Sequence, residues 1–212
     1  MVHQEGIEMS FSLVDVPVGV DGDWEIDRIV VDAEGASKSA LHAQIAAYQG
    51  RREFPVPEGS YTRLRHHSQV VMSDTPSEMF DHAEFLRVAE GRVFIAGLGI
   101  GMVLQGVLNK PTVKHVTVVE LSENVLRLVA PHYQAKFGRD RLTILQGDAT
   151  FWTPPRGTHK NPFDAAWFDI WNDKCADNLD DISKIKKRWF RWAKWRGFWA
   201  EDQIRAYQRR RR

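Results

Sequence analysis

Three glycines at alternate positions, Gly97, Gly99 and Gly101, follow a short apolar run and precede a helix-forming run. The run before them reads VFIA and the run after them reads MVLQ, so the pattern predicts a strand, a tight turn and a helix. Glycine suits such a turn because it adopts φ > 0 and has no Cβ to block a ligand lying against the main chain. The free N–H groups at the start of the helix would face that ligand.

Three acidic side chains follow further runs that read as buried strands. Glu120 ends the run 113–121, Asp148 follows the run 142–145, and Asp169 lies near the end of the run 163–171. Ligands of open α/β sheets bind at the carboxyl ends of the strands. We therefore expect these carboxylates to meet the glycine turn in one crevice. Glu120, at the tip of the second strand, has two oxygens that can accept from the two hydroxyls of a ribose.

Residues 90–175 resemble the class I S-adenosylmethionine-dependent methyltransferase superfamily in four pieces, GLGIG, VVEL, QGDA and FDAAWFDIW. This resemblance implies S-adenosylmethionine as the cofactor. The three glycines would pass under its methionine part, Glu120 would hold its ribose, and Asp148 with Ala149 would hold its adenine. The upstream stretch 61–80 is similar to the entry of the spermidine synthase-like branch. Small viral and bacterial proteins of this superfamily with VMSDTP, GLGIGM and DIW look closer still.

Two positions depart from the spermidine synthase pattern. Ile100 stands in the glycine turn where those enzymes carry an acidic residue, and Asn172 stands where they carry a second aspartate. Both differences count against aminopropyl transfer. Methyl transfer to a small molecule or a nucleic acid is the leading hypothesis. Another use of the same cofactor, or binding without catalysis, stays open.

The stretch DIWND, residues 169–173, is the expected chemical end of the site. Methyl transfer from a sulfonium is an in-line displacement that depends on holding donor and acceptor in contact. Asp169 is the first choice for orienting the acceptor or taking its proton, and Asn172 and Asp173 would position the acceptor. The alternative is that Asp169 only caps the following helix. No acceptor-defining motif is present, so the sequence does not identify the methyl acceptor.

The elements that must position these residues form an α/β fold. We expect a Rossmann-like, mostly parallel sheet of four to five strands in residues 61–212, a truncated class I methyltransferase core. A small β-rich extension would occupy residues 1–60, with strands over 11–20 and 24–31 and a helix over 37–48. Residues 61–72 predict a hairpin and residues 76–89 a helix, whereas the crossover 150–162 is too rich in proline for one.

Several side chains outside the main motifs have two interpretations. Asp74 and Thr75 either cap the helix that follows them or form a lid over the crevice. Phe151 and Trp152 either flank the adenine ring or plug the edge of the sheet. His66 and His67 are neighbours that would point to opposite faces of a strand. Since no third ligand lies close to them in the sequence, we expect no metal site.

The C-terminal part, from about residue 178, is basic and rich in tryptophan. Residues 184–212 contain 12 Lys or Arg against two acidic residues. We expect a helix over 178–193, a strand over 195–199 and a helix over 201–212. The tryptophans either pack against the sheet beside a solvated basic face, or they and the basic residues bind nucleic acid. No sequence is left for the closing hairpin of the usual fold, so we expect residues 1–60 or a second subunit to hold the acceptor.

Composition limits the remaining possibilities. The 212 residues are 43% apolar and 27% charged, with a formal net charge of +1, as expected for a globular protein in water. A single cysteine suits a reducing compartment. No apolar run is long enough to cross a membrane, and no leader pattern opens the sequence. We therefore expect a cytoplasmic protein with no membrane contact.

Overall fold

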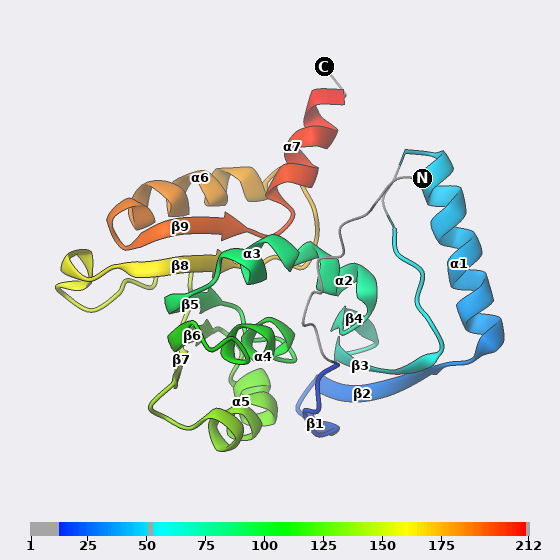
Figure 1. Ribbon diagram of the computed structural model, residues 1–212, viewed down its shortest axis with the longest axis horizontal. Helices are drawn as coiled ribbons and strands as arrows, with labels where there is room; N and C mark the ends of the chain where they lie inside the picture. Colours follow the sequence, from blue (N-terminus) through cyan, green and yellow to red (C-terminus); the bar gives the residue numbers. More distant parts are fainter. Residues whose placement is uncertain (1–12, 51–52, 211–212) are drawn as a thin grey trace.

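The computed structural model describes residues 13–50 and 53–210, and its larger sheet confirms the expected α/β class (Figure 1). Five strands, all parallel to their neighbours, lie in the order β7-β6-β5-β8-β9. Their bounds are β5 Gly91–Ala96, β6 Val113–Glu120, β7 Leu142–Gln146, β8 Phe163–Phe168 and β9 Ala193–Phe198. Because β5 pairs with both β6 and β8, the strand order reverses beside β5. A crevice at the carboxyl ends is expected at such a reversal.

Side chains of the central strands alternate between two buried clusters. Val93 and Ile95 pack with α3 (Ala83–Val88), α4 (Met102–Leu108) and α5 (Glu123–Phe137). Phe94 and Ala96 point the other way and pack with α6 (Asn178–Arg188) and Trp189. Helices therefore cover both faces of the parallel sheet, and the apolar strand sequences follow from this double burial. Between β7 and β8 the described chain has only a 3-10 turn, Thr158–Lys160, which agrees with the predicted loop.

The C-terminal elements follow the expected order with different bounds. Helix α6 ends at Arg188, and a 3-10 turn, Trp189–Arg191, replaces the rest of the helix expected over 178–193. Strand β9 starts at Ala193 and α7 spans Glu201–Arg210. No helix in the described part of the chain has both the length and the apolar character needed to cross a membrane.

A second, antiparallel sheet has the order β1-β2-β3-β4 and includes the predicted hairpin. Its strands are β1 Gly19–Asp21, β2 Trp24–Val31, β3 Gly59–His66 and β4 Gln69–Ser73, so the sheet continues past residue 60. The strand expected over 11–20 is shorter, since residues 13–18 are not in a strand and residues 11 and 12 lie outside the described part. Helix α1, Ala33–Tyr48, begins earlier than residue 37, because the Asp32 side chain accepts from Gly35 N–H at its start.

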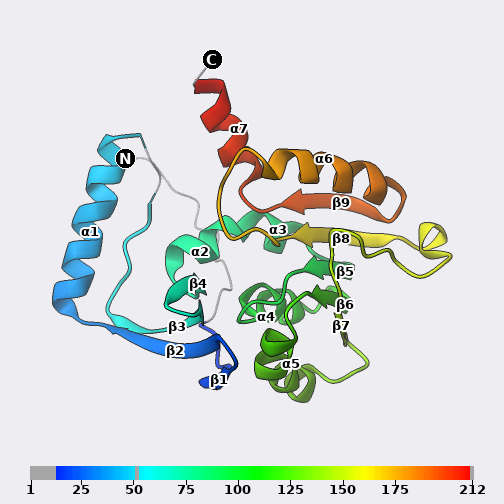
Figure 2. The ribbon, with the colours of Figure 1, turned by 180° about the vertical axis from the view of Figure 1, so that it is seen from behind.

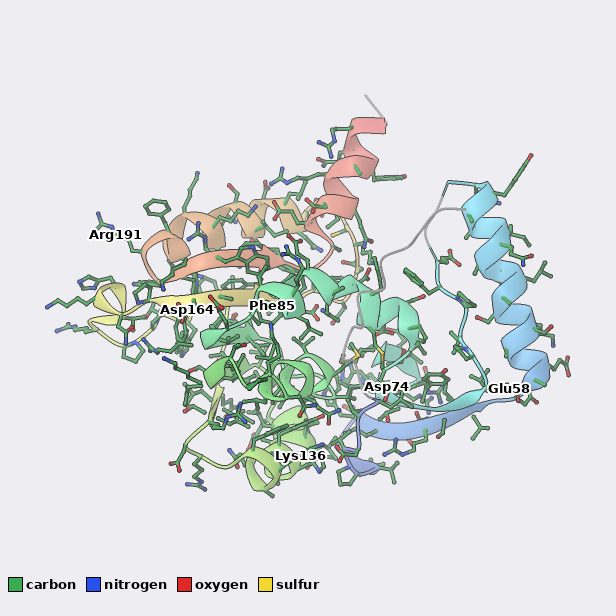
Figure 3. All side chains as sticks on the ribbon, in the orientation of Figure 1. Glu58, Asp74, Phe85, Lys136, Asp164 and Arg191 are labelled. Atoms are coloured by element: carbon green, nitrogen blue, oxygen red, sulfur yellow. The ribbon has the colours of Figure 1, made fainter. Side chains whose placement is uncertain are left out.

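Polar contacts dock the antiparallel sheet on α5, and Figures 1 and 2 both place β1 beside that helix. The carboxylate of Asp21 accepts from Arg127 Nε and Nη2, each at 2.8 Å, and from Asn124 Nδ2 at 2.6 Å. Lys136, labelled on α5 in Figure 3, pairs with Asp15 at 2.9 Å. The first described residues are thus tied to the middle of the chain.

The turn before α2 is a structural junction. Asp74, labelled in Figure 3, is fully buried and accepts from Val14 N–H at 2.9 Å and from Thr62 N–H at 2.7 Å. Thr75 is the N-cap residue, but its side chain makes no capping hydrogen bond. The capping interpretation therefore holds for the position of Thr75, whereas the Asp74 side chain binds Val14 and Thr62 and does not cap the helix. Neither residue lines the cavity described below, although Ser77 and Glu78 of the same turn do, so the lid interpretation stays a prediction for the turn.

The helix expected over 76–89 is broken. It consists of α2, Pro76–Asp81, and α3, Ala83–Val88, which meet at His82. The backbone of His82 has φ −101° and ψ 0°, outside regular helix values. The break turns the side chain of His82 toward the carboxyl end of β8, where Asp169 lies.

Candidate active site

A cavity of about 1160 Å³ lies at the carboxyl ends of the parallel strands, between them and the antiparallel sheet. Six residues singled out from the sequence at the edge of the parallel sheet line it: Gly97, Gly99, Glu120, Asp148, Ala149 and Asp169. The opposite walls come from α2, from Gly50, Glu53 and Phe54 after α1, and from α7. Asn172 also lines the cavity, whereas Gly101 and Asp173 do not.

All three turn glycines have positive φ, at 93°, 51° and 76° in chain order. Packing of the protein also requires two of them. A Cβ on Gly97 would lie 2.2 Å from the carbonyl oxygen of Asp169, and one on Gly101 would lie 2.0 Å from the ring of Tyr133. Gly101 is buried at the start of α4 and serves the fold. Its expected contact with a ligand is not seen in the cavity lining.

The thioether of Met72 covers the middle of the turn. A Cβ on Gly99 would lie 2.0 Å from Met72 Sδ, and Ile100 N–H donates to that sulfur at 3.3 Å. Met72 belongs to β4, so the antiparallel sheet supplies a wall of the cavity at the glycine turn. Any ligand that uses the Ile100 N–H must displace this side chain.

The carboxylates of Glu120 and Asp148 are held by backbone N–H groups. Glu120 accepts from Leu98 N–H at 2.7 Å and from Ser122 N–H at 2.8 Å. Asp148 accepts from Thr150 N–H at 2.8 Å. Because an ionised carboxylate has about four acceptor positions, both residues keep capacity for the hydroxyls or amino group of a ligand. Their orientation is set before a ligand arrives.

Asp169 extends β8 into the cavity. Its N–H donates to the carbonyl of Ala96 at 3.0 Å, which fixes the backbone beside the glycine turn. Burial raises the pKa of its carboxyl to about 7, and the negative charges of Glu78 and Asp81 add to this increase, while Lys174 opposes it. The next helix starts at Asn178 with Asp177 as its N-cap, so the alternative that Asp169 caps that helix is wrong.

His82 is a site residue that the sequence analysis missed. Its Nε2 lies 3.7 Å from Asp169 Oδ2, and its ring meets Trp167 edge-on with centroids 5.7 Å apart. Burial lowers the pKa of the imidazole to about 4, against the opposing charge of Asp81. Within the described chain, its buried Nδ1 has no hydrogen-bond partner. His82 is therefore neutral at pH 7 beside a carboxyl group that is about half protonated.

The cavity carries more negative than positive side chains. Glu78 and Asp81 of α2 line it together with Asp169, Glu120 and Asp148, and Lys174 is the cation among the lining residues of the described chain. Lys174 Nζ is held by Asp81 Oδ2 at 2.9 Å and by Gln203 Oε1 at 2.8 Å. Burial also raises the pKa of Glu78. This balance favours ligands that carry positive charge.

Most of the singled-out aromatic side chains pack in the core. Trp189 is fully buried, and Trp195 stacks on Phe85 with ring centroids 5.9 Å apart. Trp152 stacks on Phe94 at 5.1 Å, and neither it nor the exposed Phe151 lines the cavity. The packing interpretation holds for these tryptophans, and flanking of an adenine in this cavity by residues 151 and 152 is not supported.

Comparison with known proteins finds partial structural similarities at low sequence identity. No protein-family model matches the sequence, and no curated protein does. Spermidine synthase from Thermotoga maritima is similar over 84% of this chain and 53% of its own, with 15% identity and a TM-score of 0.46. The methyltransferase domain of bacterial CtHen1 is similar over 49% and 53%, with 22% identity and a TM-score of 0.38.

A dimethyladenosine transferase from Plasmodium falciparum is similar over 50% of this chain and 35% of its own, with 20% identity and a TM-score of 0.37. The chain thus spans between about a third and about half of the length of these structures. The chemistry of the site therefore has to be inferred from the residues of the cavity.

Proposed function

We propose that this protein transfers the methyl group of S-adenosylmethionine to an acceptor that is not yet identified. One observation carries the proposal: the glycine turn, Glu120, Asp148 and Asp169, which are far apart in sequence, line one cavity at the carboxyl ends of the strands. Ligands of open α/β sheets bind at this position.

The residues of the cavity fit this cofactor. Glu120, whose carboxylate accepts from Leu98 N–H in the cavity, would accept from a ribose diol, and Asp148 with Ala149 would hold the adenine. The excess of carboxylates suits the positive charges of the sulfonium and the amino group. S-adenosylmethionine would supply a methyl group on a sulfonium, which is open to in-line attack by a nucleophile.

Asp169 and His82 are the groups that can accept the proton that the acceptor loses during methyl transfer. The ionised carboxylate of Asp169 accepts a hydrogen bond from an amine or hydroxyl and orients its lone pair. A pKa of about 7 leaves both forms of the carboxyl group available near neutral pH. The neutral imidazole of His82, 3.7 Å away, can share the proton that the acceptor loses.

Binding without turnover is a second candidate function, and Met72 is the observation that favours it. The Met72 thioether accepts from Ile100 N–H at 3.3 Å and covers the turn that the methionine part of the cofactor would approach. A protein that only binds nucleosides needs the side of the cavity with Glu120 and Asp148 and does not need access to the glycine turn. S-adenosylhomocysteine formation by the purified protein separates the two functions.

The first test is calorimetric titration with S-adenosylmethionine and S-adenosylhomocysteine. We expect binding by the wild-type protein and at least about tenfold weaker binding by Asp148→Ala, since a hydrogen bond to a charged group is lost. Asp140→Ala removes an exposed carboxylate outside the cavity and serves as the matched control. Absence of binding to both ligands, or equal binding by Asp148→Ala, would contradict the proposed cofactor site.

A further inference from the structure

Two turns at one end of the antiparallel sheet bring together three side chains that bind metals in proteins. Asp23 lies in the turn between β1 and β2, and His66 and His67 lie at the turn between β3 and β4. One ligand atom from each of these residues lies within 4.8 Å of the others. His67 Nδ1 and Asp23 Oδ1 are 3.6 Å apart.

Strand pairing explains why the sequence analysis saw only two of the three ligands. β2 and β3 are antiparallel with Trp24 opposite His66, so the start of one strand meets the end of the other. The expectation that no third ligand lies near the histidines is therefore wrong. The expectation of opposite-facing neighbours also fails, because His67 leaves the strand with φ 53° and its ring lies 4.4 Å from that of His66.

We propose that Asp23, His66 and His67 bind a divalent transition-metal ion of the zinc type. Two imidazoles and a carboxylate form a donor set that such ions prefer, with a further position left for water. Ligand atoms about 2.0–2.2 Å from a tetrahedral ion lie about 3.3 Å from one another, close to the His67–Asp23 separation. The side chains of Asp23 and His67 are 67% and 63% exposed, so they are free to rotate onto the ion.

The backbone around the three residues is already constrained. His67 N–H donates to the carbonyl of Asp23 at 2.7 Å, which joins the two turns directly. The Asp21 carboxylate, held by Arg127 and Asn124, fixes the first turn on α5. Trp24 stacks on His66 with ring centroids 4.4 Å apart. A metal site gains from ligands that are held in this way before the ion arrives.

The positive φ of His67 also supports a metal site at this position. This φ is unfavourable for a histidine, and glycine would occupy the position without strain. Strained residues of this kind cluster at ligand-binding sites. The strained backbone places the imidazole of His67 beside Asp23, where both side chains can bind the same ion.

The bound ion would join the two turns of the antiparallel sheet. Trp24, which stacks on His66, also lines the large cavity, so the metal site adjoins the proposed active site without sharing a metal ligand with it. The inference stands whether or not the protein is a methyltransferase.

The test is titration of the untagged full chain with Zn²⁺ by calorimetry, and with Co²⁺ by visible absorption. We expect one ion per chain, a d–d absorption band typical of nitrogen and oxygen ligands, and a thermal unfolding midpoint that rises with ion concentration. His66→Ala and Asp23→Asn should bind more than about tenfold more weakly. His42→Ala changes an exposed histidine on α1 and should bind like wild type.

His67→Gly separates the effect of the backbone strain on stability from the effect of losing a metal ligand. This variant should unfold at a higher temperature than wild type without metal, because glycine tolerates the positive φ, and it should lose the stabilisation by Zn²⁺. Its circular dichroism shows whether the fold is kept. The proposal is overturned if wild type binds no Zn²⁺ in a one-to-one ratio, if the three site variants bind as wild type does, or if His42→Ala weakens binding equally.

Discussion

The pKa values of partly buried Asp169 and buried His82 each move toward the usual range of the other group. Desolvation disfavours the charged form of each, so the pKa of the carboxyl rises to about 7 and the pKa of the imidazole falls to about 4. The pair can then hold one proton between them near neutral pH. Pairs of titratable groups with such displaced pKa values are typical of acid–base sites.

Asp169→Asn tests the chemical role of this carboxyl group. We expect S-adenosylhomocysteine formation to fall by about 10²–10⁴-fold, the usual contribution of a positioned acid or base. In wild type the rate should rise with pH through about 7 as Asp169 ionises, and the variant should lose this rise. Cofactor affinity within a few-fold of wild type shows that the cavity is intact. An unchanged rate and pH profile would exclude Asp169.

The same substitution changes the pH dependence of stability. Below about pH 4 the carboxyl group is protonated in both the folded and the unfolded chain. Between its usual value of 3.8 and about 7 only the folded state keeps the proton, so its contribution to stability is lost as the pH rises. We expect Asp169→Asn to gain stability over wild type across this window, by at most about 1.4 kcal/mol per pH unit.

Urea unfolding at several pH values measures this difference, with Asp140→Asn on an exposed loop as the control. A difference between variant and wild type that stays constant from pH 4 to 7 would mean that burial does not perturb Asp169.

The residues of the site differ in how far the sequence could predict them. Glu120, Asp148 and Asp169 each follow a buried strand, so the rule that carboxyl ends of parallel strands meet at one edge was enough to bring them together. His82 lies within an apolar run that reads as one helix. Its place opposite Asp169 depends on the break between α2 and α3, for which the sequence carries no clear signal.

At the scale of elements, the glycine turn combines backbone conformation with close packing. Gly97→Ala would meet both constraints, since φ is 93° and the new Cβ would lie 2.2 Å from a backbone oxygen of Asp169. We expect a loss of more than about 3 kcal/mol, because positive φ alone costs about 1–3 kcal/mol. Gly138→Ala, with φ 76° and no atom within 4 Å of the new Cβ, measures the cost of positive φ alone. Equal losses in the two variants would show that packing does not constrain the turn.

The Asp74 junction predicts a different outcome. Asp74→Ala leaves the N–H groups of Val14 and Thr62 without their acceptor in a buried place, so we expect a loss of about 2–5 kcal/mol. Cofactor affinity in the folded variant should stay unchanged, because Asp74 does not line the cavity. Thermal unfolding and calorimetry on the same sample measure both quantities. A fall in affinity with unchanged stability would favour the lid interpretation instead.

Periodicity and turn residues predicted most elements, including the hairpin at His67 and the mostly parallel sheet. The ends of α6 and the break at His82 were not predictable in the same way. Trp189 continues the helical pattern of α6 but packs on Phe94 and Phe168, and this tertiary contact ends the helix. Local sequence patterns contain no information on such contacts.

For the molecule as a whole, charge is concentrated in the C-terminal part. Lys187, Arg191 and Arg209 lie on exposed positions of α6, the turn after it and α7, and Phe190 beside them is 70% exposed. The guanidinium of Arg196 lies 5.7 Å from the ring centroid of Phe190, within cation–π range. Since the tryptophans are largely in the core, a nucleic acid would meet the basic side chains and this phenylalanine.

We therefore expect weak, salt-dependent binding of single-stranded oligonucleotides. The affinity should fall steeply between 50 and 200 mM salt, since each neutralised phosphate releases a counterion. Lys187→Glu combined with Arg191→Glu should reduce binding at low salt, and Lys38→Glu on α1 is a control at a distant basic position. Fluorescence anisotropy measures these effects. Binding that does not respond to salt or to the double variant would exclude this surface.

The contacts between the antiparallel sheet and α5 determine which part of the protein has to fold first. Asp21 and Arg127 are 106 residues apart in the chain, and Asp15 and Lys136 are 121 apart. During synthesis the first hairpin strands therefore leave the ribosome long before the helix that anchors them. The parallel core, which contains α5, has to form before β1 has a surface to dock on, and contacts of such long separation form slowly. Refolding should accordingly show core formation first and closure of the cavity by β4 and Met72 as a later, slower event.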